Sequence, residues 1–550
     1  MNRGLTATRA ALAAIIAVAL LLRLYLVGFG LPGLYDPDEP LFMVKAAGLL
    51  TGRTLDPHWF GHPGSTTIYL TALIQALVFI AGWIGGRFAN VADFVHAAYA
   101  DPAIVFVPVR IAMALLGTAC VALTYALGKQ LYGKPAGLLA AFLLALNSLH
   151  IAWSQVVRTD VQASAFMLAA LVVASRPGGG GSGKRAIWAG LLTGFAVATK
   201  WPAISVFGGV IGALAHHSVT TGSGWRGAAR LILISAIASV AGLFIASPFI
   251  FIDYPTVLSN LAGEARPFHV GHTGAGPLAN LGTYLGIFAR NSMGWIGLAL
   301  AGAGFVFAFI RRGPARYILI PATLVFFAGI CVQHLIWSRW LIPGLPYLAL
   351  FASAAVFELA DFASRRTIHT AIVATTAGLA VLASAAGAVG EVRERSHDTR
   401  DEAARWIVAH ATRGSTIIIE YPELKLRAQP FRFLFPVGSR GCEDARSLLT
   451  SNIRYDDIQQ ARGGSPVVDL GAVPPGAQTS CRADYAVLIY YDLYLKEADR
   501  FPREVAAYRQ ILAGGQTVAL FRPKPGRIGG PIVRIVAVPQ QPDRNHSRPG

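Results

Sequence analysis

Apolar runs long enough to cross a bilayer recur through the first 390 residues of the chain, separated by short polar breaks. A transmembrane helix needs roughly 20 consecutive apolar residues. The runs lie near 7–29, 66–86, 104–128, 136–152, 161–175, 187–199, 202–217, 228–247, 292–310, 316–334, 338–359 and 368–390. The pattern predicts a polytopic α-helical membrane protein. The first run is too long for a signal-peptide core and lacks a clear cleavage site, so we expect a retained first span.

The pattern changes after residue 390, where a charged stretch precedes alternating strand-like and helical segments. A helix is predicted from Asp401 and a strand at 415–421, and a helical run follows at 502–512. Three further strand-like runs read "ADYAVLIYYD", "TVALFRP" and "PIVRIVAV". We therefore expect a small α/β domain over 391–550, ending in a disordered tail, "QPDRNHSRPG".

The second apolar run decides the topology, because every later loop changes side if 66–86 crosses the membrane. Cytoplasmic loops carry an excess of Lys and Arg. If 66–86 does not cross, all the basic loops fall inside with Arg3 and Arg9: Lys129/Lys134, Arg176/Lys184/Arg185, Arg226/Arg230, Arg311/Arg312/Arg316 and Arg365/Arg366. We therefore expect about eleven spans in a module over 1–390, with the N-terminus inside. The run at 66–86 is then an interfacial apolar helix within external loop 30–107; a second external loop covers 250–290, and 391–550 is also external.

Composition supports the membrane assignment and explains the charge. The 550 residues are 54% hydrophobic and 14% charged, with a net charge of +18 and a mean hydropathy of +0.51. The basic residues cluster between apolar runs, so they indicate topology and not nucleic-acid binding. No GxGxxG or Walker loop is present, so an activated substrate is expected to arrive without a nucleotide. Cys442 and Cys481 are the two cysteines of the last domain, and either a disulfide or two free thiols fits them.

Three carboxylates, Asp36, Asp38 and Glu39, follow the first span within four residues. A helix cap before Pro40 would account for one of them. Like charges this close raise one another's pKa, so we expect a functional acid among the three. The stretch "WSQVVRTDVQASAF" places Arg158 and Asp160 at the mouth of another span, where a cap and an interfacial anchor would also explain them.

Several basic and imidazole side chains fall on the same predicted face. Arg110 lies about six residues into an apolar run, so it should face a carboxylate or an anionic ligand. Lys200 and Arg339 could be snorkelling anchors. His58 and His62 in "HWFGHPGSTTIYL" are a weak zinc signal, and packing or substrate contact is favoured over a metal. A loop with Glu264, Arg266, His269 and His272 could be a substrate gate or a connector.

Five motifs together resemble the GT-C membrane glycosyltransferases, and within them the bacterial family 39 relatives of protein O-mannosyltransferases and lipid A aminoarabinose transferases. They are "DPDEP", "HPGSTTIYL", "VVRTDVQASAF", "GLLTGFAVATKWPA" and "SRWLIPGLPYLAL", and the resemblance covers roughly residues 30 to 360. The stretches "DTRDEAARWIVAHATRGSTIIIE" and "FPREVAAYRQILAGGQTVALFRP" resemble the external tail of some members. One departure concerns donor and acceptor choice: mannosyltransferases often read His-Pro-Pro-x-x-Lys where this chain has "HPGSTT".

The resemblance implies transfer of a sugar from a polyprenyl-phosphate donor to an acceptor hydroxyl on a lipid, glycan or protein, with inversion, at the external face of the bacterial inner membrane. It maps the catalytic acid onto Asp38, with Glu39 beside it and Asp160 as the second acid. For the donor phosphate we nominate Arg110, Lys200, Arg339 and Arg158, and we expect Arg158 to hold Asp160. Substrate-contact candidates are Asp36, His62, Glu264, Arg266 and His269. No cofactor is assigned, and a divalent metal stays open.

Two other functions fit parts of the pattern. Many spans and glycine-rich apolar segments would also suit a transporter or lipid flippase, although no internal repeat is apparent and the carboxylates fall at one face. A membrane-anchored sensor or scaffold would use 391–550 as a ligand-binding domain, but it would not need so many spans.

Overall fold

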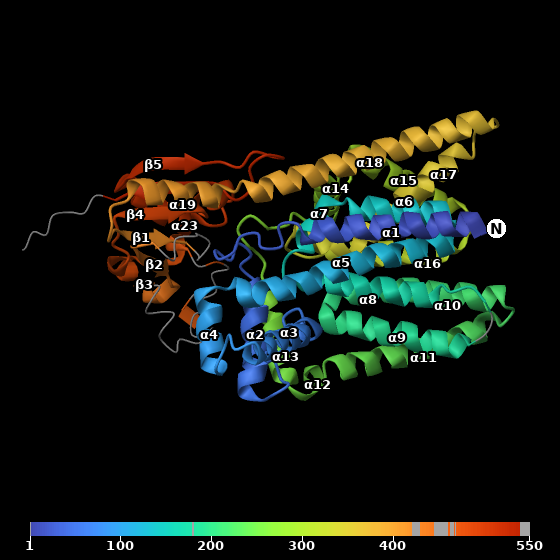
Figure 1. Cartoon of the computed structure of the whole chain (residues 1–550), viewed down its shortest axis with the longest axis horizontal. Coiled ribbons are helices and arrows are strands. Elements are labelled where there is room, and N and C mark those ends of the chain that lie inside the picture. The colour runs from blue at the N-terminus through green and yellow to red at the C-terminus, as the bar shows by residue number, and fades with distance from the viewer. Residues whose placement is uncertain are drawn as a thin grey trace, which may run out of the picture. The chain divides into compact units, whose positions relative to one another are not determined.

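The computed structural model describes residues 2–178, 181–420, 429–444, 460–461, 467 and 469–538. The chain forms two compact units. The membrane unit comprises Met1–Gly28, Asp38–Phe268 and Gly274–Glu391, and the C-terminal unit comprises Phe29–Pro37, His269–Thr273 and Val392–Gly550. Figure 1 shows the long helices of the membrane unit running alongside one another, with α4 lying across α5.

Apart from one isolated β-bridge, the regular secondary structure described in the membrane unit is helical. Its helices are α1 (Asn2–Leu24), α2 (Glu39–Gly52), α3 (Ser65–Ile84), α4 (Val91–Ala100), α5 (Ala103–Tyr132), α6 (Lys134–Ala145), α7 (Ser148–Trp153), α8 (Thr159–Ala174), α9 (Ser182–Thr199), η1 (Trp201–Ser205), α10 (Val206–Thr220), α11 (Gly224–Ala246), α12 (Phe249–Ile252), α13 (Tyr254–Glu264), α14 (Pro277–Asn291), α15 (Gly294–Ile310), α16 (Pro314–Cys331), η2 (Ser338–Gly344), α17 (Leu345–Ala360) and most of α18 (Arg366–Ser396).

The predicted multi-pass membrane protein is confirmed by the length and composition of these helices. Within the described ranges, eight helical segments are long and apolar enough to cross a membrane: Thr6–Leu24, Ser65–Ile84, Ala103–Tyr132, Trp201–Thr220, Gly224–Ala246, Pro314–Cys331, Ser338–Ala360 and Arg366–Ser396. Shorter apolar helices cover Lys134–Ala145, Thr159–Ala174 and Gly294–Ile310. The interfacial placement of α3 and the count of about eleven spans stay predictions.

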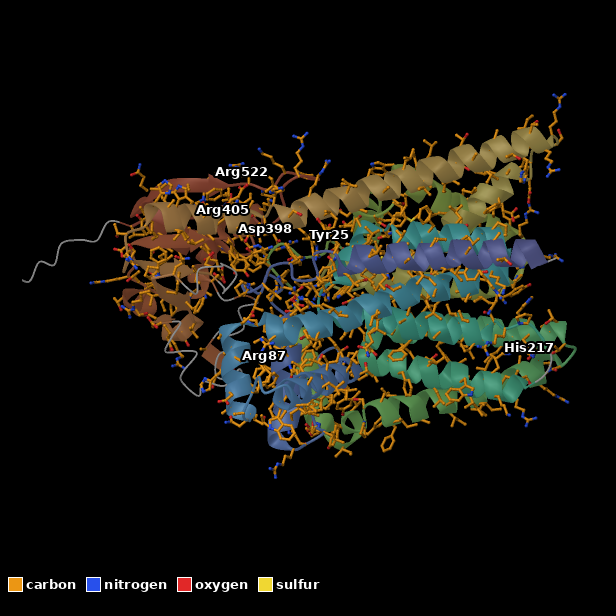
Figure 2. All side chains as sticks on the ribbon, viewed as in Figure 1. Tyr25, Arg87, His217, Asp398, Arg405 and Arg522 are labelled. Carbon is orange, nitrogen blue, oxygen red and sulfur yellow. A yellow bond between two sulfur atoms is a disulfide. The ribbon has the colours of Figure 1, made fainter. Side chains whose placement is uncertain are left out.

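The two ends of the membrane unit can be followed in Figure 2. Arg87 follows α3 and His217 lies in the last turn of α10, and the two side chains lie at opposite ends of the unit. The loops after α3 and after α10 therefore open at different ends of the bundle.

Small residues let the helices of the bundle approach closely. A Cβ added at Gly194 of α9 would lie 2.2 Å from the carbonyl oxygen of Ser239 in α11. One added at Gly304 of α15 would lie 1.8 Å from the carbonyl oxygen of Phe351 in α17. Lipid tails are as apolar as the helices, so close packing of this kind is a main source of helix association in membranes.

The C-terminal unit contains a six-stranded sheet in the order β3-β2-β1-β4-β6-β5. The strands are β1 (Thr416–Ile419), β2 (Arg432–Pro436), β3 (Cys442–Asp444), β4 (Tyr485–Leu488), β5 (Gln516–Phe521) and β6 (Val533–Ala537). The pairs of β1 with β2 and with β4 are parallel, and the others are antiparallel. The predicted α/β domain is confirmed, as are the strands at 415–421, in "ADYAVLIYYD", in "TVALFRP" and in "PIVRIVAV".

The two faces of this sheet follow from side-chain alternation along β1. Ile417 packs on one face with Ala403 and Ile407 of α19 (Thr399–His410). Ile418 packs on the other face with Tyr508 of α23 (Pro502–Ala513). A short helix, α22 (Tyr491–Lys496), precedes α23. The two helices predicted from the sequence, from Asp401 and at 502–512, therefore each cover one face of the sheet.

A disulfide joins Cys442 and Cys481, which confirms one of the two alternatives left open by the sequence. The expected disordered tail at 541–550 lies outside the described residues.

A pair of buried carboxylates lies beside the end of β1. Glu420 follows β1 and accepts hydrogen bonds from the backbone N–H groups of Ile489 and Leu470, at 2.7 and 3.1 Å. Asp469 accepts from the Tyr494 hydroxyl at 3.0 Å. Burial, together with the charge of Glu420, raises the pKa of Asp469 to about 8, so this carboxyl is mostly protonated at neutral pH.

Candidate active site

Asp38 immediately precedes α2, but its side chain does not cap that helix. The carboxylate instead forms an ion pair with Arg158, and its Oδ2 lies 3.6 Å from Nη2 of Arg339. The Asp38 side chain is 38% exposed, whereas both arginine side chains are buried. Helix capping therefore does not explain this acid, which faces two cations from distant segments.

Asp160 lies in the first turn of α8 and forms a buried ion pair with Lys200. Lys200 follows α9, and an isolated β-bridge pairs it with Pro63. Next to this bridge, the N–H of Trp201 donates to the carbonyl of His62 at 2.8 Å. The loop before α3 is thus fastened to the segment that carries Lys200.

The expected pairing of Arg158 with Asp160 is wrong. Arg158 pairs with Asp38, and Asp160 pairs with Lys200. Arg158 stands at the N-cap of α8, two positions before Asp160, and side chains two positions apart do not face each other on a helix. Helix geometry therefore turns the side chains of Arg158 and Asp160 to different sides, although both residues belong to one motif.

Aromatic rings support both guanidinium groups of the site. The Arg158 Cζ atom lies 5.8 Å from the ring centroid of Trp153, and the Arg339 Cζ atom lies 4.0 Å from that of Trp337. A guanidinium over an indole face is attracted by the ring and loses side-chain freedom. These tryptophans were not among the residues predicted from the sequence, although "IWSRWL" places one of them two residues before Arg339.

Burial and the neighbouring cations together set the protonation of Asp38 and His62. Burial alone would raise the pKa of Asp38, but Arg158 and Arg339 outweigh it and hold this pKa below its ordinary value. Burial, reinforced by Lys200 and Arg339, lowers the pKa of His62 to about 3. At neutral pH the site therefore holds an ionised Asp38 and a neutral His62. The Nδ1 atom of His62 is buried and has no hydrogen-bond partner among the described residues.

Glu39 and Arg110 form a second, fully buried ion pair. Arg110 Nε donates to Glu39 Oε1 at 2.9 Å, and Arg110 Nη2 to Glu39 Oε2 at 2.5 Å. Two further contacts come from the backbone: the Val157 N–H donates to Glu39 Oε1 at 2.7 Å, and Arg110 Nη1 donates to the carbonyl of Val27 at 3.0 Å. The expectation that Arg110 should face a carboxylate or an anion is met by Glu39.

The remaining contact candidates are spread over both units. A Cβ added at Gly61 would lie 3.0 Å from Oε1 of Glu264, so this acid reaches the loop before α3. Arg266 donates from Nε to the carbonyl of Gly263, in the last turn of α13, at 2.9 Å. Asp36 and His269 belong to the C-terminal unit.

An apolar hollow lies beside Lys200. It is lined by Ala163, Lys200, Pro202, Ala203, Phe326, Ile330, Trp340 and Pro343, and its volume is about 10 Å³. Such a volume holds about one water molecule. The hollow combines one ammonium group with apolar walls, and it is closed to larger ligands in this conformation.

Arg23, a fully buried cation in α1, was not predicted as a functional residue from the sequence. Its guanidinium donates to the carbonyls of Ala19, Ala145 and Leu144 at 3.0 to 3.2 Å and lies 3.0 Å from Nδ1 of His150. These contacts tie α1 to α6 and α7. A lone arginine within an apolar run was the available signal, as it was for Arg110.

Metal ligation by the two acids has no support from the described residues. The described histidines, cysteines and acids bring three ligand atoms together in one group, Asp56, His58 and Asp253, which includes neither Asp38 nor Asp160.

Comparisons with known proteins agree with this fold. Residues 104–252 match the family described as dolichyl-phosphate-mannose-protein mannosyltransferase. None of the curated protein sequences matches the chain. The crystal structure of ArnT from Cupriavidus metallidurans in the apo state aligns with a TM-score of 0.50 and 13% identity, covering 97% of this chain and 100% of that one.

Two further solved structures align at a similar level. ArnT from Cupriavidus metallidurans bound to undecaprenyl phosphate gives a TM-score of 0.49 at 13% identity, covering 96% of this chain and 99% of that one. The archaeal oligosaccharyltransferase AglB from Archaeoglobus fulgidus, in complex with an inhibitory peptide and a dolichol-phosphate, gives a TM-score of 0.49 at 12% identity. This alignment covers 92% of this chain and 72% of that one. The likeness to apo ArnT shows the fold. With the family match, it fits a GT-C membrane glycosyltransferase of the ArnT and mannosyltransferase type.

Proposed function

We propose that the chain is an inverting glycosyltransferase that moves a sugar from a polyprenyl-phosphate donor to an acceptor hydroxyl, at the extracytoplasmic face of a bacterial cytoplasmic membrane. The observation that carries the proposal is the pair of acids at the starts of α2 and α8, each in contact with buried cations. The match of 104–252 to a family named for a lipid-phosphate-linked sugar donor supports the donor class.

The cations suit a phosphate leaving group. When the sugar leaves its lipid phosphate, negative charge develops on the phosphate oxygens, and preorganised cations in a poorly hydrated site stabilise it strongly. Arg158, Arg339 and Lys200 are buried and held by rings or backbone contacts, so they need little reorganisation. We assign the donor phosphate to these three groups.

Asp38 is assigned as the general base that removes the acceptor proton. In the resting protein its pKa is held low by two arginines, which makes it a weak base. A donor phosphate would compete with the carboxylate for the same guanidinium groups. Drawing them away would raise the pKa of Asp38 towards its ordinary value, so donor binding would strengthen the base.

The other acids receive different roles. Asp160 positions Lys200, because the two form a buried pair beside the apolar hollow. Both carboxylate oxygens of Glu39 already accept hydrogen bonds, from Arg110 and from a backbone N–H. We therefore assign Glu39 and Arg110 to positioning the start of α2, next to Asp38, and not to the donor phosphate. His62 and Glu264 are assigned to substrate contact.

The hollow beside Lys200 supports a lipid-linked donor. Its walls are apolar apart from the ammonium group, which matches a phosphate attached to a hydrocarbon chain. At about 10 Å³ it is far too small for such a ligand. Binding therefore requires α16 and η2, which carry Phe326 and Trp340, to move away from Lys200.

The test is Asp38→Asn in the purified full-length protein, incubated with radiolabelled polyprenyl-phosphate sugars. We expect transfer to fall by about 10²- to 10⁴-fold, the usual contribution of a general base, with donor binding retained. Asp499→Asn is the matched control, because Asp499 is an exposed acid. Full transfer by Asp38→Asn at normal expression would rule out the assigned base. Movement of the labelled lipid across liposomes with its sugar linkage intact would instead indicate a flippase.

A further inference from the structure

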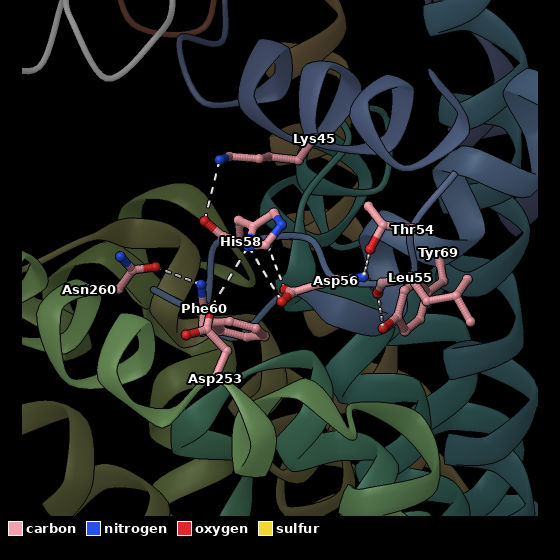
Figure 3. Close-up of polar contacts among 9 residues, drawn as sticks. All are labelled: Lys45, Thr54, Leu55, Asp56, His58, Phe60, Tyr69, Asp253 and Asn260. Atoms are coloured by element: carbon pink, nitrogen blue, oxygen red, sulfur yellow. Dashed lines mark hydrogen bonds and ion pairs between the residues drawn. The ribbon is translucent and has the colours of Figure 1, made fainter. Parts of the chain in front are cut away.

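A cluster of metal-ligating side chains lies at the loop before α3, and the proposed glycosyl transfer does not use it. Asp56 and His58 come from this loop, and Asp253 comes from the junction of α12 and α13 (Figure 3). The three residues belong to the same compact unit, although nearly 200 positions separate Asp253 from the other two. The fold therefore brings together an imidazole and two carboxylates from distant parts of the chain.

The distances within the cluster suit a small divalent cation. Nδ1 of His58 lies 3.3 Å from Oδ2 of Asp56 and 3.8 Å from Oδ2 of Asp253, and all the ligand atoms lie within 4.8 Å of one another. Tetrahedral Zn²⁺ with bonds of about 2.0 to 2.2 Å separates its ligand atoms by about 3.3 to 3.6 Å. A shift of roughly 1 Å would bring the three atoms onto one ion at these bond lengths.

The loop around the cluster is ordered by contacts that orient the ligands (Figure 3). Oδ1 of Asp56 accepts the His58 N–H at 2.9 Å, which leaves Oδ2 to face the imidazole. Thr54 Oγ1 accepts the Asp56 N–H at 3.1 Å, and Lys45 Nζ donates to the His58 carbonyl at 3.4 Å. A hydrogen bond to a ligating carboxylate, such as the one that Asp56 Oδ1 accepts, is a regular feature of metal sites.

Exposure of the three side chains provides an entry path. The Asp56 and Asp253 side chains are 11% and 24% exposed, whereas that of His58 is 67% exposed. An ion can thus arrive from solvent on the imidazole side and keep a water molecule as its fourth ligand. Two carboxylates offset the charge of a divalent ion, and an imidazole ligand favours Zn²⁺ or a related transition metal over Mg²⁺ and Ca²⁺.

We propose that Asp56, His58 and Asp253 bind a divalent transition-metal ion of the Zn²⁺ class, and that this ion fastens the loop before α3 to the start of α13. The loop also contacts α13 directly: Asn260 Oδ1 accepts the N–H of Phe60 at 2.7 Å. A few residues later the same loop pairs with the segment of Lys200. The ion would therefore hold in place a loop that leads into the candidate active site, whether or not the site transfers sugar.

The competing explanation is an ion pair without metal, in which a protonated His58 bridges the two carboxylates. Measurements of metal binding distinguish the proposed metal site from this ion pair. We would strip the untagged full-length protein in detergent with a chelator, titrate it with Zn²⁺ by calorimetry, and record the visible absorption spectrum with Co²⁺ in its place. The expected results are tight binding of one Zn²⁺ at this site and a Co²⁺ spectrum typical of low coordination number.

Two variants and two matched controls assign the site. His58→Gln and Asp253→Asn should each weaken Zn²⁺ binding by more than about tenfold and remove the Co²⁺ absorption, since ligand loss costs at least as much as loss of a supporting contact. His96→Gln and Asp101→Asn, exposed residues on and after α4, should bind as wild type does. Zn²⁺ should also raise the unfolding temperature of the wild type but not of the two site variants.

Three results would overturn the proposal. Unchanged Zn²⁺ binding in both site variants would place the ion elsewhere, and wild-type binding no tighter than that of the variants would favour the metal-free ion pair. Displacement of Zn²⁺ by an equal concentration of Mg²⁺ would exclude the transition-metal assignment. Because the variants keep the size of each side chain and the readout is binding, failure here is distinct from failure of the proposed transferase activity.

Discussion

The positioning role assigned to Glu39 and Arg110 can be tested, because the two residues form a buried ion pair. The perturbation is Arg110→Met, which keeps most of the side-chain volume and removes the charge. Glu39 is 0% exposed and would keep the Val157 N–H as a described hydrogen-bond donor. Leaving one partner of a buried ion pair uncompensated typically costs about 3 to 5 kcal/mol.

The same reasoning predicts the outcome of a double-mutant cycle. Glu39→Gln alone leaves the buried guanidinium of Arg110 without its counter-charge, so it should cost a similar amount. Combining Glu39→Gln with Arg110→Met removes both charges together. The double variant should therefore be more stable than the sum of the single changes predicts, by a coupling energy of about 2 to 3 kcal/mol.

Two buried thiols in the bundle provide the assay. Cys120 in α5 and Cys331 in α16 are free and buried, so a thiol-reactive fluorophore reports unfolding of the membrane unit in a denaturant titration. Arg87→Met is the matched control, since Arg87 is exposed and its loss should change the unfolding free energy by less than about 0.5 kcal/mol. If Arg110→Met unfolds like the wild type while the Michaelis constant for the donor rises, the buried pair is wrong and Arg110 contacts the phosphate.

Three further predictions follow from described contacts. Lys200→Met should abolish sugar transfer and destabilise the bundle by about 3 to 5 kcal/mol, because it leaves Asp160 unpaired. Adding Asp160→Asn should restore stability, measured by thiol labelling, but should not restore sugar transfer. The raised pKa of Asp469, about 8, means that its contribution to stability is complete below about pH 4. This contribution is lost as the pH rises from there through 8, by at most about 6 kcal/mol. Asp469→Asn should flatten this loss, as proteolysis of the full-length protein at pH 5 and 8.5 will show. Replacing both Cys442 and Cys481 by Ala should destabilise the C-terminal unit by about 2 to 4 kcal/mol without changing the transfer rate; a slower rate at full expression would contradict the structural role.

The sequence predicted much of the fold because the strongest signals are local. Apolar runs set the helices of the membrane unit, and short apolar runs rich in β-branched and aromatic residues set β1, β4, β5 and β6 of the sheet. The strands that escaped notice lack these signals. β3 is three residues long and two of them are acids, and β2 begins with Arg432 and ends with Pro436. Pairing with a neighbouring strand, and not local pattern, defines them.

The candidate site was predictable as a set of residues but not as a set of pairs. Motifs identified Asp38, Asp160, Lys200 and Arg339 as members. Which cation meets which acid depends on how α2, α8 and the loop before α3 pack, and these contacts join residues up to about 300 positions apart. Asp38 shows why the pairs could not be predicted. The sequence allowed it to cap α2, but in the fold its side chain contacts Arg158 instead.

The resting pairs explain how so many charges can share one rim of an apolar bundle. An uncompensated charge in such a place costs several kcal/mol, but each acid here faces a cation, so the group as a whole is tolerated. Because these cations already face the acids, an anionic donor that bound them would compete with the acids for the same groups. If Asp38 is the base, the arginines that keep it ionised and inert in the resting protein are the groups that the donor phosphate must capture. Binding of the donor phosphate to these arginines would then also raise the pKa of Asp38 and so activate the base.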